Sequence, residues 1–332
     1  MKVDEIKKYV DRLLTNIYLK LDYSDLIGDN MRLLIVEGVT DRQFIKSILK
    51  EDVICEIANK AFESHDLGNN LNNKRAIEQV VSGLSKIPLA FLKLPDKFNG
   101  LVVYGLIDKD FDDEFEIQKS NRLFVTDTHD LETLMISSDK GILNRLENCI
   151  VSEEESKKAF YIAYQLGLLR KTIIESVDER ISLKPISGWL GEVNYSSFLE
   201  GYEINVRKLI SYINANNDEP LSKTKEKKVA DKLIANKLLR KKLNKDGVWD
   251  SSWESFDCSD AEVWSVMNGH DILSVLRYIS QDAYDSFGDE AFNIVNRKFE
   301  FALIKAYDYS SLSNTDLYKA MYRENVIVEL ND

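Results

Sequence analysis

The fold class that the sequence predicts is α/β: a mostly parallel sheet flanked by helices, followed by a mainly α-helical second domain. In the first half of the chain, short apolar runs of strand length alternate with segments of helical apolar spacing. Beyond Leu146 the spacing is mainly helical. We therefore expect an N-terminal amphipathic helix within residues 1–30 that packs on the core, an α/β domain at 31–146 and a helical domain at 147–332.

Each element of the first domain follows from its local pattern. Leu101 to Ile107 is too short and too evenly apolar for an amphipathic helix and favours a buried strand of a parallel sheet. Thr40 and Gln43 predict a capping box at the start of a helix. The expected elements are strands at 31–38, 53–58, 101–107 and 122–126 and helices at 41–50 and 74–84. The connection before the last strand is barely long enough for a parallel crossover, so its direction is left open.

Composition limits where the protein works and what it binds. The 332 residues are 44% hydrophobic, and no apolar run approaches the roughly 18 residues of a membrane span. The N-terminal residues lack the apolar stretch of a signal peptide, so we expect a cytoplasmic protein without membrane contact. Cys55, Cys149 and Cys258 are too far apart to predict a disulfide framework or a zinc site, and buried free thiols are expected.

The charge is unevenly distributed. The net charge is −12, which argues against bulk electrostatic binding of nucleic acid. Residues 221–245, however, hold nine lysines and Arg240 against two acids. We expect any contact with a polyanion there, with Lys237, Arg240, Lys241, Lys242 and Lys245 as candidate phosphate ligands. The alternative is an amphipathic helix whose lysines are only solvated.

Carboxylates follow two of the predicted strands. Glu37 ends the first apolar run, and Asp108 and Asp110 follow the run 101–107. If the strand stays extended through residue 110, Asp108 and Asp110 point the same way. Ligands of parallel sheets gather at the carboxyl edge, and clustered carboxylates suit Mg²⁺ or Mn²⁺ better than zinc. The alternative is that these acids are solvated residues or turn formers.

Three sequence motifs together resemble a known family. They are IVEGxTDxxF at 35–44, LIDKDFDD at 106–113 and TDTHDLETL at 126–134. The first two look like the glutamate and Asp-x-Asp motifs of the TOPRIM domain. In this order, all three resemble the OLD-like TOPRIM nucleases, a family that includes the nuclease subunit of PARIS anti-phage defence systems. The resemblance covers a little under half of the chain.

The resemblance implies an enzyme, a Mg-dependent endonuclease that cuts RNA, with tRNA as a candidate, or DNA. Glu37 would be a metal ligand or general base, and Asp108 and Asp110 metal ligands. Glu132 would be a later acid that completes the metal site, with His129 as a further candidate acid or base. In the family an ABC-type ATPase accompanies the nuclease. Because this chain has no GxxxxGK[ST] sequence, we expect the ATPase to be a separate subunit that controls a toxic effector.

Alternatives remain open at this point. Asp108 and Asp110 also resemble the nucleophile and acid pair of haloacid-dehalogenase phosphatases, although that motif leaves Glu37 without a role. The other alternative is a non-catalytic TOPRIM scaffold that binds nucleic acid or a partner. For Glu132 the alternative is an acid that complements a helix N-terminus, and for His129 it is a hydrogen-bonded linker.

The helical half contains further signals. Ser152 with Glu155 and Ser259 with Glu262 predict capping boxes. The second would open a helix over 261–279, in which the Asn-Gly-His-Asp run at 268–271 predicts a break or a close approach. His270 and Asp271 either reach toward the acidic edge or are satisfied by neighbouring groups. The aromatic-rich segment 292–322 predicts core packing or, alternatively, a partner or homodimer surface.

Overall fold

The chain forms two compact units. The computed structural model describes residues 32–58, 74, 77, 78, 80, 81, 101–110, 120–145, 152–176, 193–217, 220–279 and 295–330. One unit comprises Met1–Asp127 and Tyr307–Asp332, and the other Thr128–Ala306. The division thus falls earlier than the expected boundary at 146, and the C-terminal segment belongs to the first unit. The helix expected within residues 1–30 lies outside the described residues.

The first unit contains a four-stranded, all-parallel sheet. Its strands lie in the order β2 (Val53–Ile57), β1 (Arg32–Val36), β3 (Val102–Ile107) and β4 (Leu123–Val125). The α/β class and the positions of the expected strands are confirmed. The direction of β4, which the sequence left open, is parallel. The apolar runs of the two central strands, β1 and β3, are buried because helices cover the sheet.

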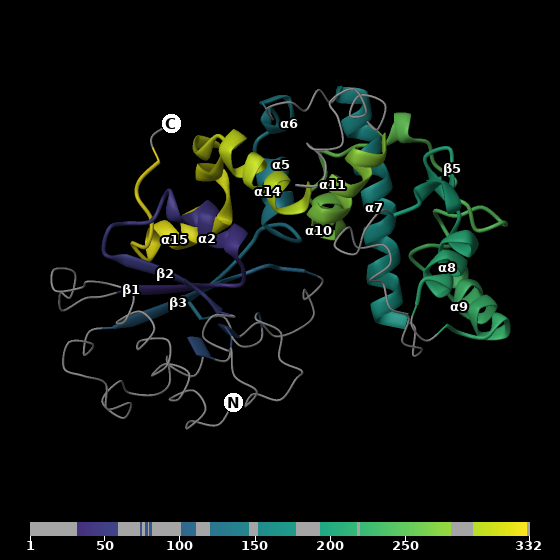
Figure 1. Cartoon of the computed structure of the whole chain (residues 1–332), viewed down its shortest axis with the longest axis horizontal. Coiled ribbons are helices and arrows are strands. Elements are labelled where there is room, and N and C mark those ends of the chain that lie inside the picture. Colours follow the sequence, from purple (N-terminus) through teal and green to yellow (C-terminus); the bar gives the residue numbers. More distant parts are fainter. Residues whose placement is uncertain are drawn as a thin grey trace. The chain divides into compact units, whose positions relative to one another are not determined.

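Helix α2 (Val39–Lys46) and the C-terminal segment lie together on one side of this sheet (Figure 1). The segment contains η8 (Tyr309–Asn314) and α15 (Asp316–Arg323). Tyr309 stacks on the ring of Phe44 and donates a hydrogen bond from its hydroxyl to the Phe44 carbonyl, 2.9 Å away. Leu49 forms a β-bridge with Ile327. Core packing is therefore the role of this part of the aromatic-rich segment, and these contacts explain why it belongs to the first unit.

The start of α2 differs from the predicted capping box. Its N-cap is Gly38, and the Asp41 carboxylate accepts the Gly38 N–H at 2.7 Å. The prediction that Thr40 and Gln43 form the box is wrong, because the helix begins at Val39, two residues earlier than a Thr40 cap allows.

A second helical segment packs on the same sheet through Gly105 of β3. Residues 74, 77, 78, 80 and 81 are helical, as expected for the helix at 74–84. A Cβ at Gly105 would lie 2.4 Å from Cγ2 of Ile77 and 3.0 Å from Cγ2 of Val81. The glycine therefore lets this segment approach the strand closely.

The cysteines partly follow expectation. Cys55 on β2 is a buried free thiol, and burial raises its pKa to about 12. Cys258 is free but only partly buried. Cys149 lies outside the described residues.

The second unit is mainly helical, as expected. Its described elements are α5 (Leu131–Ser138), α6 (Ile142–Arg145), α7 (Glu153–Ser176), η6 (Tyr195–Ser197), β5 (Leu199–Glu200), β6 (Glu203–Ile204), α8 (Val206–Ala215), α9 (Lys223–Ala235), η7 (Trp253–Ser255), α10 (Ala261–Val266), α11 (Gly269–Ile279) and α14 (Val295–Ala306). The Ser152–Glu155 capping box is confirmed, since the Glu155 N–H donates to the Ser152 hydroxyl. No helix in the described ranges is long and apolar enough to cross a membrane.

The helix predicted over 261–279 is broken, as the Asn-Gly-His-Asp run indicated. Asp260, one residue after the expected Ser259, caps α10 by accepting the Glu262 N–H. The chain leaves helical geometry at Met267 and starts α11 at Gly269. The carbonyl of Val266, at the end of α10, lies against Gly167 of α7, where an added Cβ would stand 1.9 Å from that oxygen.

Gly167→Ala tests this close approach. Because the obstacle is a backbone carbonyl, α7 and α10 must separate, and we expect the second unit to lose about 1–3 kcal/mol of unfolding free energy. Gly141→Ala is the matched control, since its Cβ would meet only the flexible end of Arg145. Urea denaturation of both variants measures the difference. Equal stability of the two variants would contradict the tight contact.

Candidate active site

The carboxyl ends of β1 and β3 bring two of the predicted acids together. The parallel register pairs Val36 with Leu106, so Glu37 and Asp108 leave the sheet at the same edge. The Asp108 N–H donates to Oε1 of Glu37 at 2.9 Å. This hydrogen bond joins residues that are 71 positions apart in sequence. The strand pattern predicted that both residues lie at this edge of the sheet.

The turn after β3 does not follow the predicted geometry. The shared direction of Asp108 and Asp110 was conditional on an extended strand through residue 110. This condition is not met, because β3 ends at Ile107 and Asp110 has a φ of 51°, in the left-handed region. Asp tolerates this conformation better than most residues. Strand alternation therefore does not give the two side chains a common direction.

Neighbouring elements hold this turn in place. The Lys109 N–H donates to Oγ1 of the buried Thr126, which follows β4, at 2.9 Å. Lys74 donates from its ammonium to the Lys109 carbonyl and to Oδ2 of Asp110, both at 3.0 Å. With the bond from Asp108 to Glu37, three consecutive residues are fixed by three partners. The turn is thus positioned before any ligand arrives.

The electrostatics of the edge centre on Glu37. The pKa of the Glu37 carboxyl is raised from its ordinary value of 4.5 to about 7, chiefly by burial and also by the carboxylates of Asp41 and Asp110. The Asp108 N–H and the Lys74 ammonium oppose this effect. Glu37 therefore changes protonation near neutral pH, which is the range suited to a general base.

The donor chemistry of these residues fits a hard divalent cation. Glu37, Asp41 and Asp110 offer carboxylate oxygens and affect one another electrostatically, which a cation would relieve. Within the described ranges, no group of three or more Asp, Glu, His or Cys side chains is arranged so that it could hold a metal ion. Asp110 instead pairs with Lys74. Cation binding at this edge thus requires side chains to rearrange.

The structure places Glu132 and His129 in the second unit, within a buried cluster at the start of α5. Asp130 is the N-cap: its Oδ1 accepts the Thr133 N–H at 2.9 Å and its Oδ2 the Gly269 N–H at 2.8 Å. His129 Nδ1 lies 3.3 Å from Oδ2 of Asp130. Burial alone would raise the pKa of Asp130, but His129, His270 and the Thr133 N–H together outweigh this effect, so that the pKa falls to about 2.

Glu132 lies in the first turn of α5, where an acid also complements the helix N-terminus. A Cβ at Gly269 would lie 2.4 Å from Cβ of Glu132, so the predicted close approach of this glycine is confirmed. The idea that Glu132 and His129 join Glu37 in one site concerns both units and stays a prediction.

Asp271 belongs to the same part of the second unit. It is fully buried and accepts from Nη2 of Arg170 on α7 at 2.6 Å. Burial raises the pKa of the Asp271 carboxyl, and Arg170 opposes this rise. His270 contributes to the electrostatic environment of both Asp130 and Asp271. This network ties α11 to α5 and α7, which favours a structural role for His270 and Asp271.

The lysine-rich segment is not one long helix. Helix α9 ends at Ala235, and turns follow, closed by a β-bridge between Leu243 and Trp249. Four of the five predicted phosphate ligands are exposed: Lys237, Arg240, Lys241 and Lys245. Lys242 is the exception, because its ammonium lies 5.3 Å from the centre of the Tyr164 ring. The expected single helix fails because the chain leaves helical geometry at Asn236.

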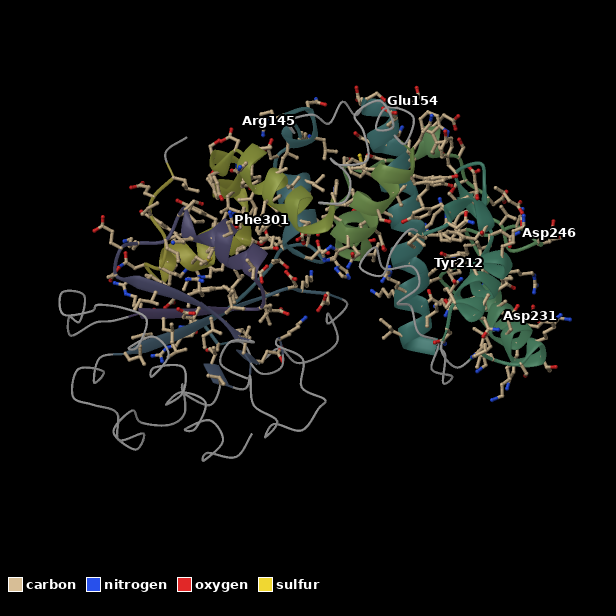
Figure 2. All side chains as sticks on the ribbon, viewed as in Figure 1. Arg145, Glu154, Tyr212, Asp231, Asp246 and Phe301 are labelled. Carbon is tan, nitrogen blue, oxygen red and sulfur yellow. The ribbon has the colours of Figure 1, made fainter. Side chains whose placement is uncertain are left out.

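The two acids of this segment are engaged by α8. Asp231 pairs with Arg207 at 2.6 Å, and Glu226 accepts from Asn214 at 2.7 Å. Figure 2 shows Asp231 on α9 and Tyr212 on the neighbouring α8. Because Arg207 offsets the charge of Asp231, the exposed lysines retain a local excess of positive charge.

Three residues at the acidic edge were not predicted from the sequence to contribute to it. Asp41 lies within the first motif but was given no role in the site, although its position four residues after Glu37 was a usable signal. Thr126 was part of a motif but had no role. Lys74 gave no signal, because a lysine at the start of an expected helix is usually exposed, whereas this side chain is 3% exposed.

Comparison with known proteins adds no further assignment. No protein-family model matches this chain, and no curated protein or solved structure is detectably similar to it.

The raised pKa of Glu37 predicts a pH-dependent stability. A carboxyl that binds its proton more tightly when folded destabilises the fold as it ionises, so stability falls as the pH rises from 4.5 to about 7. Glu37→Gln should remove this fall, on the order of 2 kcal/mol between pH 5 and pH 8. Urea denaturation across this range, with chelator present, measures it. Parallel pH profiles of the two proteins would contradict the assigned pKa.

Proposed function

We propose that this chain is a metal-dependent phosphodiester hydrolase of the OLD-like TOPRIM type. In this proposal it is an endonuclease, the toxic effector of an anti-phage defence system, and a separate ABC-type ATPase controls it. The observation that carries the proposal is the hydrogen bond between the Asp108 N–H and Glu37 at the carboxyl edge of a parallel sheet. It joins two motifs of the family resemblance at the edge where such sheets place ligands.

The protonation of Glu37 supports hydrolysis. A carboxyl with a pKa of about 7 is half ionised at neutral pH and can accept a proton from an attacking water. A Mg²⁺ or Mn²⁺ ion, when bound, would supply Lewis acidity and offset charge on the phosphoryl group. Asp108 and Asp110 would hold this ion. Glu37 would either stay uncoordinated and accept the proton or serve as a third ligand, because coordination to the cation would lower its pKa. Thr126 and Lys74 fix the turn that carries both aspartates.

The exposed lysines of the second unit support a polyanionic substrate. Lys237, Arg240, Lys241 and Lys245 lie in a segment whose acidic residues are already engaged. Such a surface binds the phosphate backbone of RNA or DNA without reading its bases. A transfer RNA is a candidate within this class.

Glu37→Ala in cells tests the catalytic role. Co-expression of the wild-type chain with the proposed ABC-type ATPase should be toxic and leave cuts in cellular RNA or DNA. Because Glu37→Ala removes the proposed base and a metal ligand, we expect survival and intact nucleic acid. Gel analysis of small RNA and genomic DNA provides the measurement. Glu51→Ala, which removes an exposed carboxylate of the same unit, is the control and should remain toxic.

The same experiment separates the alternatives. A scaffold would retain its toxicity in Glu37→Ala, because binding does not need the acid. A phosphatase that uses Asp108 and Asp110 would tolerate Glu37→Gln while losing activity in Asp108→Asn. The nuclease proposal requires that Glu37→Gln and Asp108→Asn each lose nucleic-acid cleavage.

Charge reversal at Lys237, Lys241 and Lys245 tests the basic surface. In a Glu37→Ala background that prevents cleavage, the triple Glu variant should bind a labelled RNA hairpin more weakly. The slope of log affinity against log salt should become less steep by up to about 3, because each lysine that is lost leaves about one phosphate no longer neutralised by the protein. Fluorescence anisotropy at several salt concentrations measures both quantities. Unchanged affinity and slope would refute this surface, and Lys140→Glu, exposed but outside the segment, is the control.

A further inference from the structure

Lys74 is a buried cation among the acids of the first unit. Its side chain is 3% exposed, and its ammonium lies 3.0 Å from Oδ2 of Asp110. The same ammonium donates to the Lys109 carbonyl. Its charge also acts on Glu37, whose pKa it lowers. One lysine thus offsets the negative charge of the edge that the proposed function assigns to a metal ion.

Binding an ammonium and a divalent cation to Asp110 at the same time is electrostatically unfavourable. Two cations a few ångströms apart repel each other by several kcal/mol where water is scarce. We propose, on the basis of the proposed function, that Lys74 is a built-in counter-ion that competes with the divalent cation for Asp110, so that cation binding displaces the ammonium. Lys74 then acts as a positioning residue that sets the affinity of the edge for the metal.

The exposure of the two partners fits this exchange. The side chain of Asp110 is 45% exposed and can be reached from solvent, whereas Lys74 is covered. When Asp110 turns to the cation, the ammonium keeps its hydrogen bond to the Lys109 carbonyl. A second acceptor therefore limits the cost of displacing a buried charge.

Mn²⁺ binding to the full-length chain tests the competition. The free Mn²⁺ signal in electron paramagnetic resonance reports the affinity independently of activity. Lys74→Met and Lys74→Gln both remove the charge, and the Gln variant retains a donor for the Lys109 carbonyl. We expect each to bind Mn²⁺ roughly tenfold more tightly than the wild type, because a competing cation is gone. Lys46→Met, which removes an exposed lysine of the same unit, should stay within about twofold of the wild type.

A double-mutant cycle locates the effect at Asp110. In an Asp110→Asn background, Lys74→Gln should bring a much smaller gain, since the contested carboxylate is absent and only the effect of the Lys74 charge on Glu37 remains. If the wild type binds Mn²⁺ and the folded Lys74 variants bind it equally or more weakly, the competition is overturned, but the proposed function still stands. Tighter binding in these variants, without nucleic-acid cleavage by the wild type, supports the competition and overturns the proposed function. No Mn²⁺ binding by any variant overturns both.

Discussion

The parallel pairing of β1 with β3 is the constraint on which the acidic edge depends. It aligns Val36 with Leu106, so that Glu37 and the Asp108 backbone emerge side by side and form a hydrogen bond of 2.9 Å. A shift of one residue in this register would turn every buried side chain of β3 to the opposite face. Because both strands are buried, the core itself holds the register, and the position of the edge is as stable as the sheet.

Several locally unfavourable features gather at this edge. Glu37 has a pKa raised by burial, Asp110 adopts a left-handed backbone and Lys74 is a covered lysine. Each of these features costs stability by itself. Features of this kind concentrate where a protein binds or reacts, because an ordinary fold gains nothing from them. The hydrophobic contacts of Gly105 with Ile77 and Val81 lie beneath the same strand and support it.

The sequence predicted those parts of the structure that follow from local pattern. Apolar runs of strand length placed β1 and β3, and Ser152 with Glu155 placed the start of α7. The Asn-Gly dipeptide before His270 marked the break between α10 and α11. The turn at Asp110 could not be predicted, because the bond that helps to hold it comes from Lys74, 36 residues away. The return of the C-terminal segment to the first unit likewise depends on tertiary contacts, such as that of Tyr309 with Phe44.

The contrast between the two charged clusters shows what burial does to an acid. In the second unit, Asp130 is covered but accepts two backbone N–H groups and lies against His129, so its pKa is low and its charge is retained. Burial raises the pKa of Glu37, and the carboxylates of Asp41 and Asp110 add to this rise, whereas the Asp108 N–H opposes it. A buried carboxylate that keeps its charge, such as Asp130, fixes helices in place. A carboxyl with a raised pKa can exchange a proton near neutral pH, which is why the proposed catalytic role falls to Glu37 and not to Asp130.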